Sequence, residues 1–107
     1  MPKFKVAVDH GIDREIAIQR LRSFSTKVRE DAPVEIAEVY EEWDEEGNLQ
    51  FAFAAMGLKV SGKMVTCQVK VTINGQIPFA AIPFRGQLEK QLAEKVREAL
   101  VENETLG

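Results

Sequence analysis

The stretch VTCQVKVTI, from Val65 to Ile73, decides the fold class, because apolar and polar side chains alternate along it without a break. A period of two residues is typical of a strand with one face buried and the other in water. Asn74 and Gly75 follow, and this pair is a common turn signal. We therefore predict a strand from Val65 to Ile73, with the thiol of Cys67 buried and inert.

Three further strands are expected upstream of this one. The run 34–43 alternates with a shift near Val39, the run 49–54 alternates regularly, and Gly57 separates it from the run 58–62. Four consecutive strands with short connections predict an antiparallel meander.

The two ends of the chain complete the order of elements. The run 3–8 alternates like a strand, and a helix is expected to begin near Gly11 and to end at Pro33. A second helical stripe runs from about residue 86 to about residue 104. The order β-α-β-β-β-β-α predicts a single two-layer α+β domain over residues 1–107, with both helices on one face of the sheet. This order resembles TBP-like folds and a reduced helix-grip fold, in which a curved sheet grips a long C-terminal helix.

Composition excludes several classes of protein. The 107 residues are 45% hydrophobic and 29% charged, with a net charge of −3, which disfavours nucleic acid as a partner. No apolar run approaches the ~20 residues of a membrane span, and the first residues lack a secretory signal, so we expect a cytoplasmic location. The single cysteine allows neither an internal disulfide nor a zinc cluster, and no cofactor is expected.

The segment IPFAAIPFRG, from Ile77 to Gly86, has two interpretations. Pro78 and Pro83 disfavour a regular helix and a central strand, so an extended connector is expected. Its large side chains either seal the core, at ~1.5–3 kcal/mol for each one buried, or form an exposed patch that docks a hydrophobic partner. The candidate surface consists of Phe79, Ile82, Phe84 and, from the acidic run 41–48, Trp43.

Residues capable of catalysis are scarce. Asp9 and His10 form a weak candidate polar site at a strand-to-helix turn, but no serine or cysteine stands in a nucleophile motif beside them. The acidic segment Glu41–Glu46 lacks the ligand spacing of a calcium loop and is interpreted as a solvated turn. Trp43 within it is either a lid on the core or an exposed anchor. We therefore assign no catalytic, cofactor-binding or metal-binding residue.

Several short motifs resemble the small bacterial polyhydroxyalkanoic acid system proteins. They are Asp9-His10-Gly11-Ile12, Gly57-Leu58-Lys59-Val60-Ser61-Gly62, Ile77-Pro78-Phe79 and Phe84-Arg85-Gly86-Gln87-Leu88-Glu89, together with Trp43 ahead of Leu49. Gly11 departs from the family pattern, in which a serine is usual. The resemblance implies association with polyester storage granules or their proteins, and it implies no enzymatic activity.

Three functions remain open from the sequence. The first is a non-enzymatic accessory or binding protein that acts at a polyhydroxyalkanoate granule through an apolar surface. The second is a small hydrophobic-ligand-binding module of helix-grip type, and the third is an enzyme that uses Asp9 and His10. Homodimerisation is compatible with the first two. The ligand-binding module requires an interior cavity lined by Phe51, Phe53, Val69, Val71 and Leu92.

Overall fold

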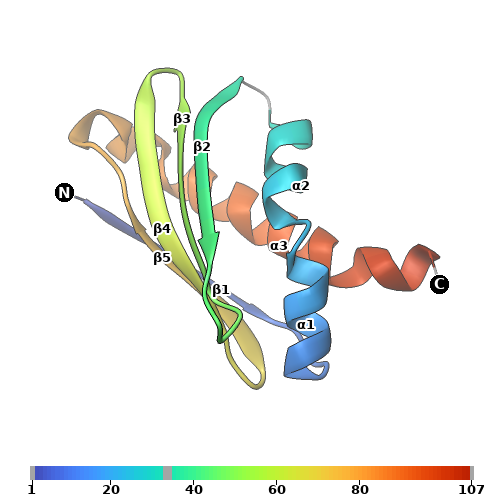
Figure 1. The fold of residues 1–107 in the computed structure, drawn as a ribbon. Helices are drawn as coiled ribbons and strands as arrows, with labels where there is room; N and C mark the ends of the chain where they lie inside the picture. The colour runs from blue at the N-terminus through green and yellow to red at the C-terminus, as the bar shows by residue number, and fades with distance from the viewer. Residues whose placement is uncertain (1, 33–34, 107) are drawn as a thin grey trace.

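The computed structural model describes residues 2–32 and 35–106, with side chains up to Val101. Its antiparallel sheet of five strands has the order β1-β5-β4-β3-β2, which confirms the predicted α+β class (Figure 1). The elements are β1 (Lys3–Asp9), α1 (Arg14–Leu21), α2 (Phe24–Asp31), β2 (Ile36–Trp43), β3 (Leu49–Ala55), β4 (Leu58–Thr66), β5 (Lys70–Gln76), the 3-10 helix η1 (Phe79–Phe84) and α3 (Arg85–Leu106).

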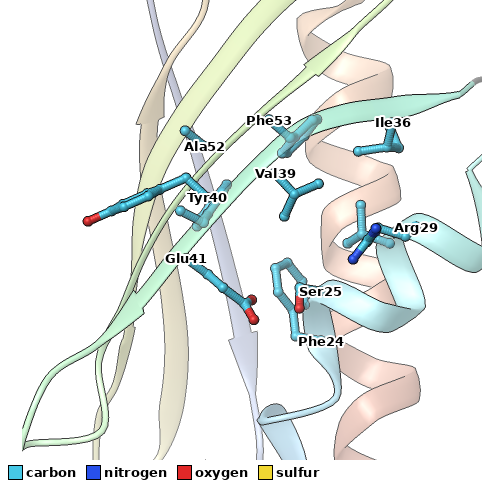
Figure 2. A pocket seen from close by; sticks show the side chains of 11 residues that line it. Phe24, Ser25, Arg29, Ile36, Val39, Tyr40, Glu41, Ala52 and Phe53 are labelled. Carbon is cyan, nitrogen blue, oxygen red and sulfur yellow. The ribbon is translucent and has the colours of Figure 1, made fainter.

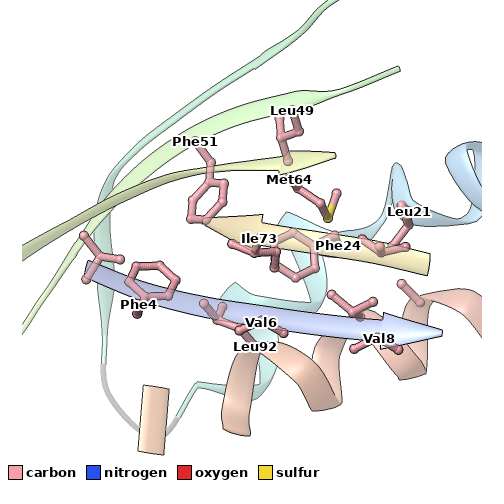
Figure 3. Close-up of a cluster of buried hydrophobic side chains, with 14 of the residues drawn as sticks. Phe4, Val6, Val8, Leu21, Phe24, Leu49, Phe51, Met64, Ile73 and Leu92 are labelled. Atoms are coloured by element: carbon pink, nitrogen blue, oxygen red, sulfur yellow. The ribbon is translucent and has the colours of Figure 1, made fainter. Parts of the chain in front are cut away.

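The helices cover one face of this sheet, and the core lies between the two layers (Figure 1). Leu49, Met64, Ile73 and Val6 stand side by side on β3, β4, β5 and β1, and all four are buried. Leu92 of α3 closes this row from the helical side (Figure 3). Burial of each such side chain contributes roughly 1.5–3 kcal/mol, so this row stabilises the packing of the two layers.

The predicted strand from Val65 to Ile73 is wrong. The chain turns at residues 67–69, and the strands on either side of this turn pair with each other as β4 and β5. Thr66 and Val71 are opposed and both face the core, so the buried parity changes across the turn and Val69 is 65% exposed. Cys67 lies in the turn and is partly exposed. The error arose because the turn contains no Gly, Pro, Asn or Asp, the usual turn residues.

Two glycines that were expected to end strands lie inside them instead. Gly62 and Gly75 are opposed on β4 and β5, and each is flanked on its other side by a phenylalanine, Phe51 on β3 and Phe4 on β1. A Cβ atom at Gly75 would lie 2.4 Å from the Phe4 ring and 2.3 Å from the Ser61 carbonyl oxygen. The glycines therefore leave the space that the two rings occupy.

The single helix predicted between Gly11 and Pro33 is divided at Arg22 and Ser23 into α1 and α2. The hydroxyl of Ser23 donates to the Arg20 carbonyl at 3.0 Å, a local bond that competes with helical pairing. Asp13, not Gly11, caps α1, and its carboxylate accepts from the Glu15 amide at 2.8 Å.

Both edges of the sheet are protected. On β1, the Lys5 amide donates to the Glu89 carboxylate at 2.9 Å, and Arg85 donates to the Lys3 carbonyl at 3.4 Å. On β2, the pairing register shifts between Ala37 and Tyr40, which confirms the shift predicted near Val39. Glu38 in this bulge has a φ of 53°, a conformation that interrupts regular pairing.

Candidate functional site

The connector from Ile77 to Gly86, which the sequence left ambiguous, buries some of its apolar side chains and exposes others. Ile77 and Ala81 are buried, whereas Phe79, Ile82 and Phe84 are 73%, 41% and 51% exposed. The predicted extended connector is wrong for most of the segment, which forms the 3-10 helix η1, and the Ala81 amide donates to the Pro78 carbonyl at 2.9 Å. Pro78 is the N-cap of this helix, and Pro83 lies inside it. We call the three exposed side chains Phe79, Ile82 and Phe84 the η1 patch.

An open groove of about 420 Å³ begins at Phe84 and runs between α2, the β3–β4 turn and α3. Its wall is mostly apolar, and Met56 and Phe84 on its rim are 73% and 51% exposed. The apolar groove, as we call it, is lined by Val28, Ala32, Ile36, Phe53, Ala55, Met56, Phe84, Leu88 and Leu92, with Gln87, Gln91 and Lys95 as its polar members.

Met56 occupies an unusual backbone conformation on this rim. It forms the two-residue β3–β4 turn with Gly57, and their φ angles are 55° and 77°. Turns with two positive φ angles favour Asn-Gly, because side chains other than Asn and Asp are strained there. The turn therefore presents a flexible apolar side chain to the groove at some cost in stability.

Lys95 is the only charged residue among the described residues that line the apolar groove. Its side chain is 11% exposed, and its ammonium lies 3.0 Å from a carboxylate oxygen of Asp31 and 3.0 Å from one of Glu98. Hydrogen bonds to these two carboxylates raise the pKa of Lys95, and the hydrogen bond from Lys95 lowers the pKa of Asp31. The charged form of Lys95 is therefore stabilised at the wall of the groove.

The interior between the sheet and the helices is filled, contrary to the cavity required by the ligand-binding hypothesis. Phe51 and Leu92 belong to the packed core (Figure 3). Val71 belongs to it as well, while Val69 is exposed at the β4–β5 turn. A void of only about 20 Å³ remains between α2, β2 and β3, which is space for about one water molecule. Phe24, Val39 and Phe53 line it, and Tyr40 points away from it (Figure 2).

His10 joins two turns through the backbone. Its Nδ1 atom accepts from the Ile12 amide at 3.2 Å, and its Nε2 atom lies 2.8 Å from the Cys67 carbonyl oxygen. Because a backbone amide can only donate, Nδ1 must be the acceptor nitrogen of the ring. Nε2 therefore carries the hydrogen and donates it in a hydrogen bond to the Cys67 carbonyl oxygen. Both ring nitrogens are thus engaged in holding the turns together. Asp9, beside it, ends β1 opposite Lys70.

Trp43 lies away from the η1 patch. It is half-buried against the core, pairs with Leu49 near the β2–β3 turn, and has the Arg22 guanidinium 4.4 Å from its ring centroid. This turn and η1 lie at opposite ends of the sheet (Figure 1). Trp43 therefore serves as a lid on the core, and the sequence grouped it with η1 residues that it does not approach.

The acidic segment forms a turn stabilised by its own carboxylate. Asp44 accepts hydrogen bonds from the amides of Glu46 and Asn48, both at 2.9 Å, and these bonds lower its pKa. In the described part of the chain, no group of three or more His, Cys, Asp or Glu side chains is placed to hold a metal ion.

The groove residues could not be identified from the sequence. Gln87, Gln91 and Lys95 look like ordinary polar positions of an amphipathic helix, and only the fold brings them into one groove with Met56. The one local signal was the Met56-Gly57 pair, where an apolar residue stands in a turn that usually takes a polar one.

Comparisons with known proteins support the fold and leave the activity open. No family model matches the sequence, and no curated protein sequence matches it either. The crystal structure of TTHA0849 from Thermus thermophilus superposes with a TM-score of 0.59 over 94% of this chain and 95% of that one, at 16% identity. The structure of DynU16, a protein of the dynemicin biosynthetic locus, superposes with a TM-score of 0.55 over 89% of this chain and 47% of that one, at 10% identity. The chain is thus similar to both structures in its α+β fold.

Among the helices of residues 2–32 and 35–106, none is both long and apolar enough to cross a membrane.

Proposed function

We propose that this chain is a non-enzymatic binding protein that holds a hydrophobic chain in the apolar groove. The observation that carries this proposal is the groove itself, about 420 Å³ in volume, with exposed Met56 and Phe84 on its rim. Pockets for small ligands usually measure ~300–1,000 Å³ and are mainly apolar. The proposal takes up the second of the three functions left open by the sequence, the ligand-binding module, and places the ligand in this groove instead of the filled interior.

The resemblance to polyhydroxyalkanoic acid system proteins supplies a setting for this function, the polyester granule of a bacterial cytoplasm. A second candidate function is attachment to the granule surface or its proteins. It is favoured by the η1 patch, because Phe79 is 73% exposed and Ile82 is 41% exposed. Exposed aromatic and aliphatic side chains that adjoin each other are a common feature of hydrophobic docking sites.

Two double variants separate the groove from the patch. Met56→Ser with Leu88→Ser changes the groove and leaves the η1 patch in place, whereas Phe79→Ser with Ile82→Ser changes the patch and leaves every groove-lining residue in place. Circular dichroism would confirm that both variants are folded.

Binding of Nile red, an uncharged apolar dye, would be followed by its fluorescence. We expect the groove variant to bind the dye about tenfold more weakly, because two apolar contacts are lost, and the patch variant to bind it like the wild type. A wild-type protein that does not bind the dye would contradict the ligand-binding function. Co-sedimentation with isolated polyester granules tests the second function, which predicts that binding is lost in the patch variant.

A further inference from the structure

The polar members of the apolar groove lie on one stripe of α3. Gln87, Gln91 and Lys95 follow one another at intervals of four residues, so they share a face of the helix. The apolar members of the groove include Val28 of α2 and Phe53 of β3. A ligand in the groove would therefore meet hydrocarbon from these elements and a line of hydrogen-bonding groups from α3.

The charges around this stripe disfavour an anionic ligand. Lys95 is already shared by the carboxylates of Asp31 and Glu98, each 3.0 Å from its ammonium. Lys27 adds a weaker attraction to Asp31, but it does not line the groove. A ligand carboxylate bound to Lys95 would be attracted by one positive charge and repelled by the two negative charges of Asp31 and Glu98. Loss of water from that carboxylate would make its binding free energy still less favourable.

Uncharged oxygen atoms suit the same stripe. An ammonium has three N–H donors, and two of those of Lys95 are used by Asp31 and Glu98. The side-chain amides of Gln87 and Gln91 each bring two more donors. A carbonyl oxygen can accept from such donors without bringing a charge into the groove.

We infer that the ligand of the apolar groove is an uncharged acyl ester and that the corresponding free carboxylate is disfavoured. This inference rests on the proposed function, since it names the chemical class of the chain that the groove holds. The ester oxygens would face Gln87, Gln91 and Lys95, and the hydrocarbon would face the apolar members of the groove.

Displacement of Nile red by methyl octanoate and by octanoate at pH 7 tests this inference. The two molecules share one chain and differ in the charge of the head. We expect the ester to displace the dye at a concentration about tenfold lower than the carboxylate. Equal displacement, or stronger displacement by octanoate, would overturn the ester inference and leave the ligand-binding function in place. If neither molecule displaces the bound dye, the ester inference fails, whereas the proposed function fails if the wild-type protein does not bind the dye or the groove variant binds it equally well.

A gain-of-function variant makes the test independent of lost stability. Gln91→Lys adds to the groove wall a positive charge that Asp31 and Glu98 do not already neutralise, so octanoate should gain about tenfold in affinity relative to the ester. Gln68→Lys adds the same charge at the exposed β4–β5 turn, away from the groove, and should leave the preference unchanged. If the two variants give the same ratio of ester to carboxylate binding, charge in the groove does not select the ligand.

Discussion

The two ends of the sheet are built differently. At one end, the β1–α1 connection and the β2–β3 and β4–β5 turns are joined by polar contacts, and Arg14 donates to the carbonyls of Thr66 and Glu46 at 2.8 and 2.6 Å. At the other end, the β3–β4 turn and η1 present exposed apolar side chains, Met56 and Phe79 among them. We call the first the fastened end and the second the open end; they lie at the bottom and the top of the sheet in Figure 1.

This difference between the two ends shows that the side-chain hydrogen bonds of His10 and Arg14 are concentrated at the fastened end. The fastened end uses directional hydrogen bonds from His10 and Arg14 to fix three chain connections. At the open end, large apolar side chains are exposed to water. Burial or replacement by polar residues would be expected there if stability were the only requirement. We therefore look for binding at the open end and for structural roles at the fastened end.

The largest expected effect is at the point where the open end joins the core. Ile77 is fully buried directly before η1, so Ile77→Ala should lower the free energy of unfolding by about 2–4 kcal/mol through lost burial and a new cavity. Phe79→Ala, two residues later, removes a side chain that is 73% exposed and should change it by less than about 0.5 kcal/mol. Urea denaturation of both variants measures the contrast. Similar losses would show that the η1 patch belongs to the core.

The next effect sharpens the role of the fastened end. Arg14→Met removes two hydrogen bonds to backbone carbonyls and should lower the free energy of unfolding by about 1–3 kcal/mol. Hydrogen exchange should become faster in the β2–β3 and β4–β5 turns and remain unchanged in the β3–β4 turn. Arg97→Met, on an exposed position of α3, is the matched control. Uniform acceleration throughout the sheet would contradict the local role of Arg14.

Met56→Asn tests whether the open end gives up stability for binding. Asparagine accepts a positive φ more readily than methionine, so the free energy of unfolding should rise by about 0.5 kcal/mol. Nile red affinity should fall at the same time, because one apolar rim contact is lost. A variant that gains stability and keeps full affinity would remove Met56 from the binding surface.

The smallest effect concerns the pH dependence of the fastened end. Two backbone hydrogen bonds lower the pKa of Asp44 in the folded state. Its contribution to stability is therefore present above the unfolded-state pKa and disappears as the pH falls through the folded-state value. Asp44→Ala should have a lower urea midpoint than the wild type at pH 7, and the two midpoints should converge below the ordinary Asp pKa of 3.8. Asp44→Asn keeps an acceptor and should differ from Asp44→Ala by an amount that does not depend on pH.

Hydrophobic patterning predicted most of the fold and little of the site. The strand 3–9, the β3 strand and the C-terminal helix follow from residue periodicity alone, because each buries one regular face. The β4–β5 turn was missed because alternation continues through Cys67 and Val69, although neither is in a strand.

The apolar groove could not be predicted from local sequence patterns, for a different reason. It depends on the distance between α2, the β3–β4 turn and α3, three segments that lie far apart in the sequence. For the connector, the two prolines were taken to favour an extended segment, and the sequence left open whether its large side chains are buried or exposed. In the structure, Ile77 precedes the 3-10 helix and is buried, and within the helix Ala81 is buried while Phe79, Ile82 and Phe84 are exposed.

The protected edges of the sheet affect how the protein behaves when it is crowded. Unpaired strand edges recruit other chains into shared sheets, which is a common beginning of aggregation. Here Glu89 and Arg85 already bond to the outer edge of β1, and the bulge at Glu38 disrupts the edge of β2. If the η1 patch gathers the protein at a hydrophobic surface, as the second proposed function requires, these protected edges would keep neighbouring copies from adding strands to one another. Replacement of Glu89 by alanine would free the Lys5 amide and should make the concentrated protein more prone to form fibrils that bind thioflavin T.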